Sequence, residues 1–165
     1  MEKRWEVVYK SRHGSSEREN TVPRYLYALP RPFDDQSLMR IRLETDAYYL
    51  IVQALQDKEY SMIVSPVHFE EANAIRDVEE RREIVAVLET LGTVAECDMA
   101  ATRARAEYLH SRKLGIADAA HVAFAEATAE VFITCDDRLA KKCRREKVGV
   151  ATVNPVEFII AEELR

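Results

Sequence analysis

The sequence lacks any apolar run long enough to cross a lipid bilayer. Its longest apolar stretches are fragments such as residues 48–52, whereas a membrane-spanning helix needs roughly 20 apolar residues. The first residues, MEKRWEVVYKSRHGSS, are charged and have no signal-peptide core. Linkers and low-complexity stretches are also missing. We therefore expect no membrane association and a single domain over residues 1–165.

Cysteine is scarce, and charge of one sign is not in large excess. The three cysteines, Cys97, Cys135 and Cys143, form no CxxC pair and have no clustered histidines beside them. This favours reduced thiols in the cytoplasm over disulfides or a zinc site. The net charge of −5 gives no global sign of nucleic-acid binding, so any polyanion must be held locally and with a metal ion.

What the chain does contain is a repeated alternation of strand and helix patterns. Helices are expected over residues 37–57, 65–75, 77–91 and 99–114 and from residue 116 onward, with strands over 61–64, 131–134 and 148–153. Gly92 and Gly115 are expected to end the third and fourth helices. Asn154 and Glu157 form a capping box that starts a last helix. The alternation predicts an α/β fold of three layers, with a central parallel sheet flanked by helices.

Two carboxylates are expected to meet at one edge of this sheet. Asp118 begins an alanine-rich helix, and Asp136 follows the apolar strand Val131–Thr134. Because a strand and its covering helix run in opposite directions, the start of the helix lies beside the end of the strand. Close carboxylates repel each other unless a cation or a shared proton lies between them. Oxygen ligands suit Mg²⁺ or Mn²⁺.

A third acid comes from the helix that starts at Ser65-Pro66. Glu70 and Glu71 lie on it, and adjacent helix positions point about 100° apart, so only one of them can face the site. The alternative is that both face solvent and complement the helix dipole. Beside Asp118 and Asp136, we favour Glu71 as the inward residue.

Four segments, SPVHFEE, GIADAAHVAFAEA, VFITCDDRL and VNPVEF, occur in this order and resemble the PIN-domain ribonucleases, the fold of many toxin nucleases. RPFDDQS, residues 31–37, resembles one branch of that family. The resemblance implies a PIN-like fold and a toxin-like endoribonuclease that depends on Mg²⁺ or Mn²⁺. It also implies RNA as substrate, with an antitoxin protein and a second copy of the chain as candidate partners.

Carried over position by position, the resemblance implies that Glu71, Asp118 and Asp136 are catalytic and bind the metal, with Thr134 supporting them. Asp137 matches either a further metal ligand or the cap of the next helix, and we favour the cap. His68 is expected on a helix surface and His121 in the packed interior.

One acid of the family pattern is missing. The resemblance implies an aspartate in the first strand, six residues before Arg31, where this sequence has Tyr25. A tyrosine hydroxyl stays protonated near neutral pH, with a pKa of about 10, and is a poor Mg²⁺ ligand. Asp34 and Asp35 are close in sequence, but they lie beyond the end of the strand.

A frameshift is one explanation for this atypical start. Codons for residues 22–25 can be read one nucleotide later as Tyr-Leu-Asp, the family pattern. We hypothesise a frameshift near Pro30, natural or from sequencing, that altered residues 1–30.

The function therefore has two interpretations. One is a metal-dependent ribonuclease, impaired by the missing aspartate. The alternative is a catalytically degenerate PIN domain that binds RNA or a protein without cutting. A basic run could hold RNA phosphates or simply form a solvated helix face; it consists of Arg138, Lys141, Lys142, Arg144, Arg145 and Lys147. An α/β phosphatase would need a phosphate loop with a nucleophilic Asp or Cys, and none is visible.

Overall fold

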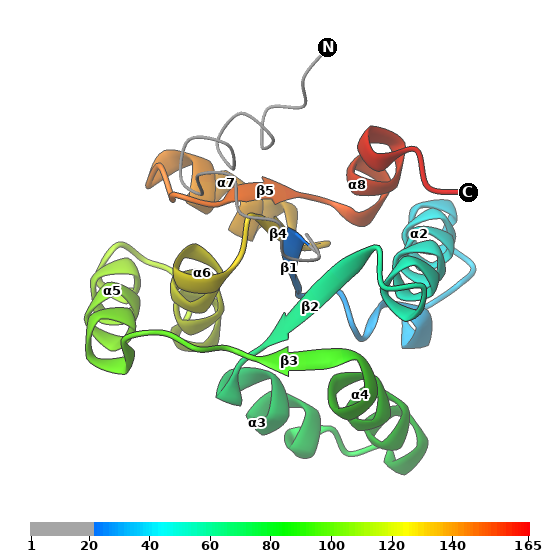
Figure 1. Ribbon diagram of the computed structural model, residues 1–165, viewed down its shortest axis with the longest axis horizontal. Helices are drawn as coiled ribbons and strands as arrows, with labels where there is room; N and C mark the ends of the chain where they lie inside the picture. The colour runs from blue at the N-terminus through cyan, green and yellow to red at the C-terminus, as the bar shows by residue number, and fades with distance from the viewer. Residues whose placement is uncertain (1–21) are drawn as a thin grey trace.

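A five-stranded parallel sheet runs through the centre of residues 22–165, which are the residues that the computed structural model describes (Figure 1). Its strands, in the spatial order β3-β2-β1-β4-β5, are β1 (Val22–Leu26), β2 (Tyr60–Val64), β3 (Gly92–Val94), β4 (Val131–Ile133) and β5 (Ala151–Val153). Each neighbouring pair is parallel, and Tyr25 of β1 lies opposite Phe132 of β4. The predicted α/β fold with a central parallel sheet is confirmed. The hypothesis of an altered segment over residues 1–30 falls mostly outside the described residues.

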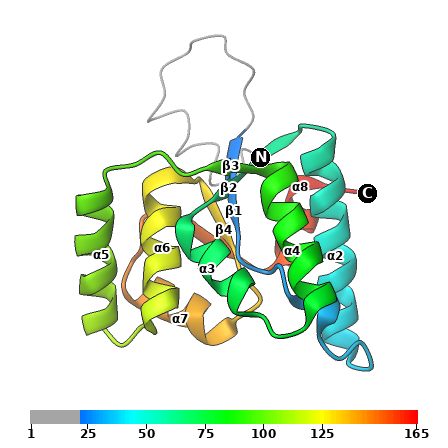
Figure 2. The ribbon, with the colours of Figure 1, turned by 90° about the horizontal axis from the view of Figure 1, so that it is seen from below.

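Helices cover both faces of the sheet. They are η1 (Arg31–Phe33), α2 (Met39–Gln56), α3 (Pro66–Ala74), α4 (Val78–Leu91), α5 (Met99–Ser111), α6 (Ile116–Thr128), α7 (Asp137–Arg145) and α8 (Pro155–Glu162). Figure 2 shows α5, α6 and α7 on one side of the sheet and α2, α4 and α8 on the other. Side chains alternate between the two faces: Tyr25 packs in one apolar cluster and Leu26 in the other. Burial on both faces explains why β4, with the sequence VFI, is continuously apolar and fully buried.

The predicted helix over 99–114 was too long at its C-terminal end. Helix α5 ends at Ser111, and Lys113 then adopts a left-handed conformation with φ of 75°. The Leu114 amide donates to the carbonyl of Leu109 over 3.3 Å, which closes the helix in the usual left-handed manner. Gly115 does not end α5, because it is the N-cap of α6.

Two strand assignments also change. The strand predicted over 148–153 is reduced to β5, because the amides of Val148 and Gly149 donate to Cys143 and Glu126 rather than to the sheet. Strand β3 was not predicted. At its start, Gly92 has an ordinary φ of −78°; a side chain there would collide with the carbonyl oxygen of Leu88 and with Val64, so glycine permits close packing rather than a left-handed cap.

The capping box at the last helix is confirmed. Asn154 accepts a hydrogen bond from the Glu157 amide over 2.8 Å, and the Glu157 carboxylate accepts one from the Asn154 amide over 2.9 Å. This pair fixes α8 directly after β5. Among residues 22–165, none of the helices has the length and apolar character needed to cross a membrane.

Candidate acidic site at the carboxyl edge of the sheet

Three of the predicted acids lie at the carboxyl edge of the sheet. Asp118 is in the first turn of α6, Glu71 is in α3, and Asp136 follows β4 and begins α7. Partial burial raises the pKa of the Asp118 carboxyl above its ordinary value; a hydrogen bond from Tyr27 opposes this shift, and the negative charge of Asp136 adds to it. Asp118 and Asp136 are therefore within electrostatic reach of each other. Glu70, the other candidate on α3, is exposed.

The hydroxyl of Tyr27 lies between two of these acids. Its oxygen is 3.2 Å from Oδ1 of Asp118 and 3.5 Å from Oε1 of Glu71. Burial first, and then the charges of Glu71 and Asp118, raise the pKa of Tyr27 well above its ordinary value. The phenol therefore stays protonated at neutral pH. It is a hydrogen-bond donor to the two carboxylates, which share its single proton.

A buried chain of hydrogen bonds supports Glu71 from the interior. His121 Nε2 lies 2.9 Å from Oε2 of Glu71, and His121 Nδ1 lies 2.7 Å from the Tyr25 hydroxyl, which in turn is 2.6 Å from the Ser65 hydroxyl. A carboxylate can only accept, so Nε2–H donates to Glu71; in the neutral imidazole Nδ1 is then the acceptor for the Tyr25 hydroxyl. Tyr25 and His121 are fully buried, so Tyr25 lies beneath the edge rather than at it.

This geometry corrects the position taken from the sequence. Counting back from Arg31 pointed to Tyr25 as the residue in place of the missing aspartate. In the structure Tyr27, two residues later, contacts the acids. Both side chains are on the same side of β1, but two residues of strand separate them by about 6.6 Å along the sheet. Sequence counting missed Tyr27 because it used only the distance from Arg31, whereas the contacts of the folded chain decide which side chain reaches the acids.

The two histidines near the site are both interior. His121 is packed, as predicted, but the prediction of a surface position for His68 was wrong. His68 Nδ1 accepts from the Ser65 amide over 3.0 Å, and its Nε2–H donates to the carbonyl of Leu26 over 3.1 Å. Burial, followed by the neighbouring His121, lowers the pKa of His68 to about 3. His68 is therefore a neutral structural residue that joins α3 to β1.

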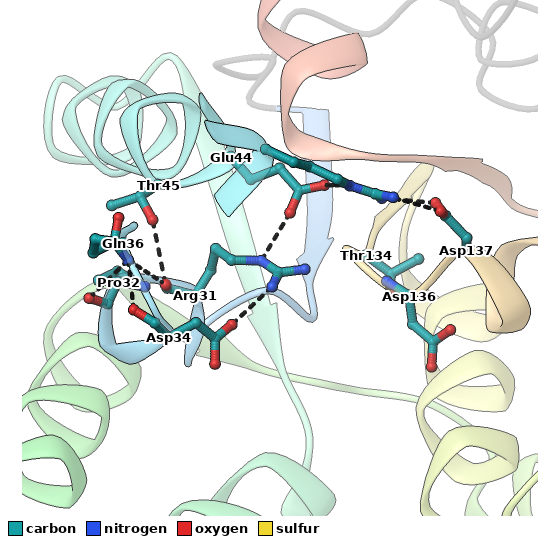
Figure 3. A network of polar contacts seen from close by, with 10 residues as sticks. Arg31, Pro32, Asp34, Gln36, Glu44, Thr45, Thr134, Asp136 and Asp137 are labelled. Atoms are coloured by element: carbon teal, nitrogen blue, oxygen red, sulfur yellow. Dashed lines mark hydrogen bonds and ion pairs between the residues drawn. The ribbon is translucent and has the colours of Figure 1, made fainter. Parts of the chain in front are cut away.

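The adjacent acids Asp136 and Asp137 point in different directions (Figure 3). Asp136 caps α7, because its Oδ1 accepts from the amides of Arg138 and Leu139 over 2.8 and 3.0 Å. The expectation that Asp137 would be the cap was wrong. Asp137 instead forms two contacts with Arg40 of α2, at 2.6 and 2.8 Å, and this pairing lowers its pKa.

Of the two, only Asp136 lies at the acidic edge. Its own amide donates to the buried Thr134 hydroxyl over 3.1 Å, which orients the turn after β4.

The RPFDDQ segment forms one wall of the site through a second network (Figure 3). Glu44 of α2, whose side chain is 3% exposed, lies 2.9 Å from Nε of Arg40 and 2.8 Å from Nε of Arg31, the latter as an ion pair without hydrogen-bond alignment. Arg31 also pairs with Asp34 at 2.8 Å. The Gln36 side-chain amide lies 3.0 to 3.3 Å from three backbone carbonyl oxygens of this segment.

Between this wall and α3 lies a cavity of about 680 Å³. Apolar side chains such as Leu29, Ile75 and Ile84 line one part of it. Glu71 and Asp136 line another part. Asp34 also lines it but is paired with Arg31, and Asp35 is exposed and accepts from the Ser37 amide at 2.9 Å. Neither replaces a first-strand carboxylate.

The predicted basic helix is α7 with the residues after it. Arg145 pairs with Glu146 and donates to the carbonyl of Arg112, so part of its charge is used within the protein. Lys142 lies near enough to Asp118 to lower its pKa. RNA binding by this helix stays a prediction.

The residues at this edge do not fit a divalent metal ion. Within residues 22–165, no group of three or more His, Cys, Asp or Glu side chains is placed to hold one. The Tyr27 hydroxyl lies between Glu71 and Asp118, and Asp137 is turned away toward Arg40. As arranged, the edge can accept hydrogen bonds and cationic groups.

Comparisons with known proteins agree with this fold. A family model described as PIN domain matches residues 33–145, a range that begins after β1. A structure of VapBC2 from Rickettsia felis bound to a DNA fragment from its promoter is similar at a TM-score of 0.51 and 12% identity, covering 81% of this chain and 98% of that one. FitAcB from Neisseria gonorrhoeae gives a TM-score of 0.47 and 15% identity, covering 80% and 97%. No curated protein sequence matches the chain.

Proposed function

Because this chain belongs to the PIN domain family, we propose that it is a toxin-type PIN domain whose acidic edge binds a polypeptide partner and does not cut RNA. The observation that carries this proposal is the position of the Tyr27 hydroxyl, 3.2 Å from Asp118 and 3.5 Å from Glu71. Metal-dependent cleavage needs a cation in contact with the acids. Here a protonated phenol lies between two of them instead.

The partner that best suits the cavity is an antitoxin-type polypeptide. Apolar side chains line part of the cavity, whereas the carboxylates of Glu71 and Asp136 line another part. Arg31, the cation in the wall, is already paired with Asp34 and Glu44. A segment that carries aliphatic residues beside an arginine or lysine complements this surface in both shape and charge. Binding of an antitoxin rests on this argument and on the family. We also propose a homodimer, from the family resemblance, and a cytoplasmic location, from the reduced thiols that the sequence predicts.

A second candidate function is the metal-dependent endoribonuclease that the family resemblance implies. The observation in its favour is the convergence of three acids, Glu71, Asp118 and Asp136, on one edge of the sheet. Under this alternative, Mg²⁺ or Mn²⁺ would have to displace the Tyr27 hydrogen bonds, and RNA would be the substrate. The two candidate functions therefore differ in whether the unmodified protein cleaves RNA.

Incubation of the full chain with labelled single-stranded RNA and Mn²⁺ or Mg²⁺ separates them. We expect the cleavage rate of the unmodified protein to equal that of an Asp118→Asn control, because neither holds a catalytic metal. Cleavage that the unmodified protein shows and Asp118→Asn loses would contradict the proposal and establish the ribonuclease. Binding of a fluorescent peptide that alternates leucine and arginine, weakened by Glu71→Gln, would support the polypeptide site; equal binding would place it elsewhere.

A further inference from the structure

One side chain, that of Tyr27, distinguishes this acidic edge most clearly from a metal-binding site. Tyr27 is the first residue after β1, and its amide donates to the carbonyl of Ile133 over 2.8 Å. This bond fixes its backbone beside the end of β4. Its ring then extends across the edge, 4.1 Å from the ring of His121 between centroids, and its hydroxyl reaches both Asp118 and Glu71.

The tyrosine opposes a cation in two ways. First, its hydroxyl occupies the position between the two carboxylates, 3.2 Å from Asp118 and 3.5 Å from Glu71, where an ion bound to both would have to sit. Mg²⁺ keeps several of its waters and takes one or two carboxylates, so it needs that space. Second, the hydroxyl supplies the carboxylates with a hydrogen bond that satisfies them without a metal. A phenol that remains protonated is a donor and cannot replace an anionic ligand.

The surrounding residues otherwise retain the features of a cation site. Asp118 and Glu71 are partly exposed rather than sealed in the core, and Asp136 adds negative charge near Asp118. His121 holds Glu71 in place from the interior over 2.9 Å. A hydrogen bond from a buried neighbour fixes the orientation of a carboxylate before a ligand binds to it.

We infer that Tyr27 is the residue that excludes divalent cations from this site, and that an aspartate in its place would create a cation site with Glu71 and Asp118. An aspartate is shorter than tyrosine, so it opens the space now filled by the ring. It also adds a third carboxylate at the end of β1. An aspartate at Tyr25, the position that the sequence suggested, would not create this cation site, because Tyr25 lies in the core against Ser65 and His121. The inference rests on the proposed function only in treating the present site as metal-free.

Mn²⁺ titration calorimetry on the full chain tests this inference, with Tyr27→Asn as a control that opens the same space without adding charge. We expect Tyr27→Asp to bind Mn²⁺ roughly tenfold or more tightly than Tyr27→Asn, because even residues that only orient a ligand change metal affinity about 10–100-fold. The gain should disappear in the double variant Tyr27→Asp/Asp118→Asn. We expect Tyr25→Asp to show no gain.

Equal Mn²⁺ affinity in Tyr27→Asp and Tyr27→Asn would overturn the inference, as would tight Asp118-dependent binding by the unmodified protein. Circular dichroism melting checks that each variant is folded. If Tyr27→Asp does not fold, Tyr27→Ala tests the exclusion itself: it should bind Mn²⁺ more tightly than the unmodified protein, and no gain would overturn the inference. These affinities are independent of RNA cleavage by the unmodified protein, which tests the proposed function.

Discussion

His121 holds Glu71 from beneath the acidic edge, with Nε2 of the imidazole 2.9 Å from Oε2 of the carboxylate. The ring is fully buried on α6, whereas Glu71 is partly exposed on α3. Nε2 carries the proton that is donated to Glu71, and in the neutral imidazole Nδ1 is left to accept one from Tyr25. The orientation of an edge carboxylate is therefore decided by groups in the core.

Loss of the Tyr25 hydroxyl should destabilise the protein. Tyr25→Phe leaves the buried His121 Nδ1 without its partner and removes one partner of the Ser65 hydroxyl, which still lies 3.4 Å from His68 Nδ1; this costs about 1–3 kcal/mol. Urea denaturation measures this as a lower midpoint with an unchanged slope. Tyr27→Phe is the matched control. Its loss of stability should be smaller, because water can hydrate the partly exposed carboxylates of Glu71 and Asp118 once the Tyr27 hydroxyl is removed. Equal losses of stability in the two variants would show that the buried chain of hydrogen bonds stabilises the protein no more than the partly exposed contacts of Tyr27 do.

Stability should fall as the pH drops below about 6.5. The pKa of His68 is lowered to about 3 in the folded protein, whereas an unfolded histidine titrates near pKa 6.5. Between these values the unfolded chain binds a proton that the folded protein does not. The contribution of neutral His68 to the free energy of unfolding is therefore complete above about pH 6.5. It is lost as the pH falls toward 3, by about 1.4 kcal/mol per pH unit.

Denaturation of the unmodified protein and His68→Gln at several pH values measures this effect. The glutamine amide can still donate toward the Leu26 carbonyl, but it does not titrate. We expect the slope between pH 6.5 and 4 to be shallower in His68→Gln by about one proton. Parallel curves for the two proteins would assign the acid sensitivity to other groups.

The two arginines around Glu44 should contribute unequally. Arg31→Met leaves the buried Glu44 carboxylate with one cation instead of two and is expected to cost up to about 3 kcal/mol. Arg40→Met also leaves Glu44 with one cation, and it removes the hydrogen bond to Glu44 together with the pair with Asp137. Because the Arg40 side chain is 55% exposed and that of Arg31 is 17% exposed, solvent screens the Arg40 pairs more strongly, and the expected loss is about 0–1 kcal/mol. Thermal melting at matched ionic strength compares them. A larger loss in Arg40→Met would mean that Arg40, not Arg31, neutralises Glu44.

The sequence by itself determined the features that depend on short-range pattern. Strand and helix alternation predicted the parallel sheet, and the Asn154 to Glu157 spacing predicted the start of α8, because capping and periodicity act within a few residues. The meeting of Asp118 and Asp136 at one edge also followed from the sequence. It needs only the direction of a helix against a strand, which the parallel topology imposes.

Only the tertiary structure decided where individual side chains point. Whether Tyr25 or Tyr27 reaches Asp118 depends on where β1 ends beside β4, a register set by contacts more than 90 residues away along the chain. His68 is interior because β1 supplies the carbonyl of Leu26 as its acceptor. Asp136 caps α7 while Asp137 turns to Arg40, a residue of α2. Local pattern determines which elements form, whereas partners distant in sequence determine what each side chain contacts.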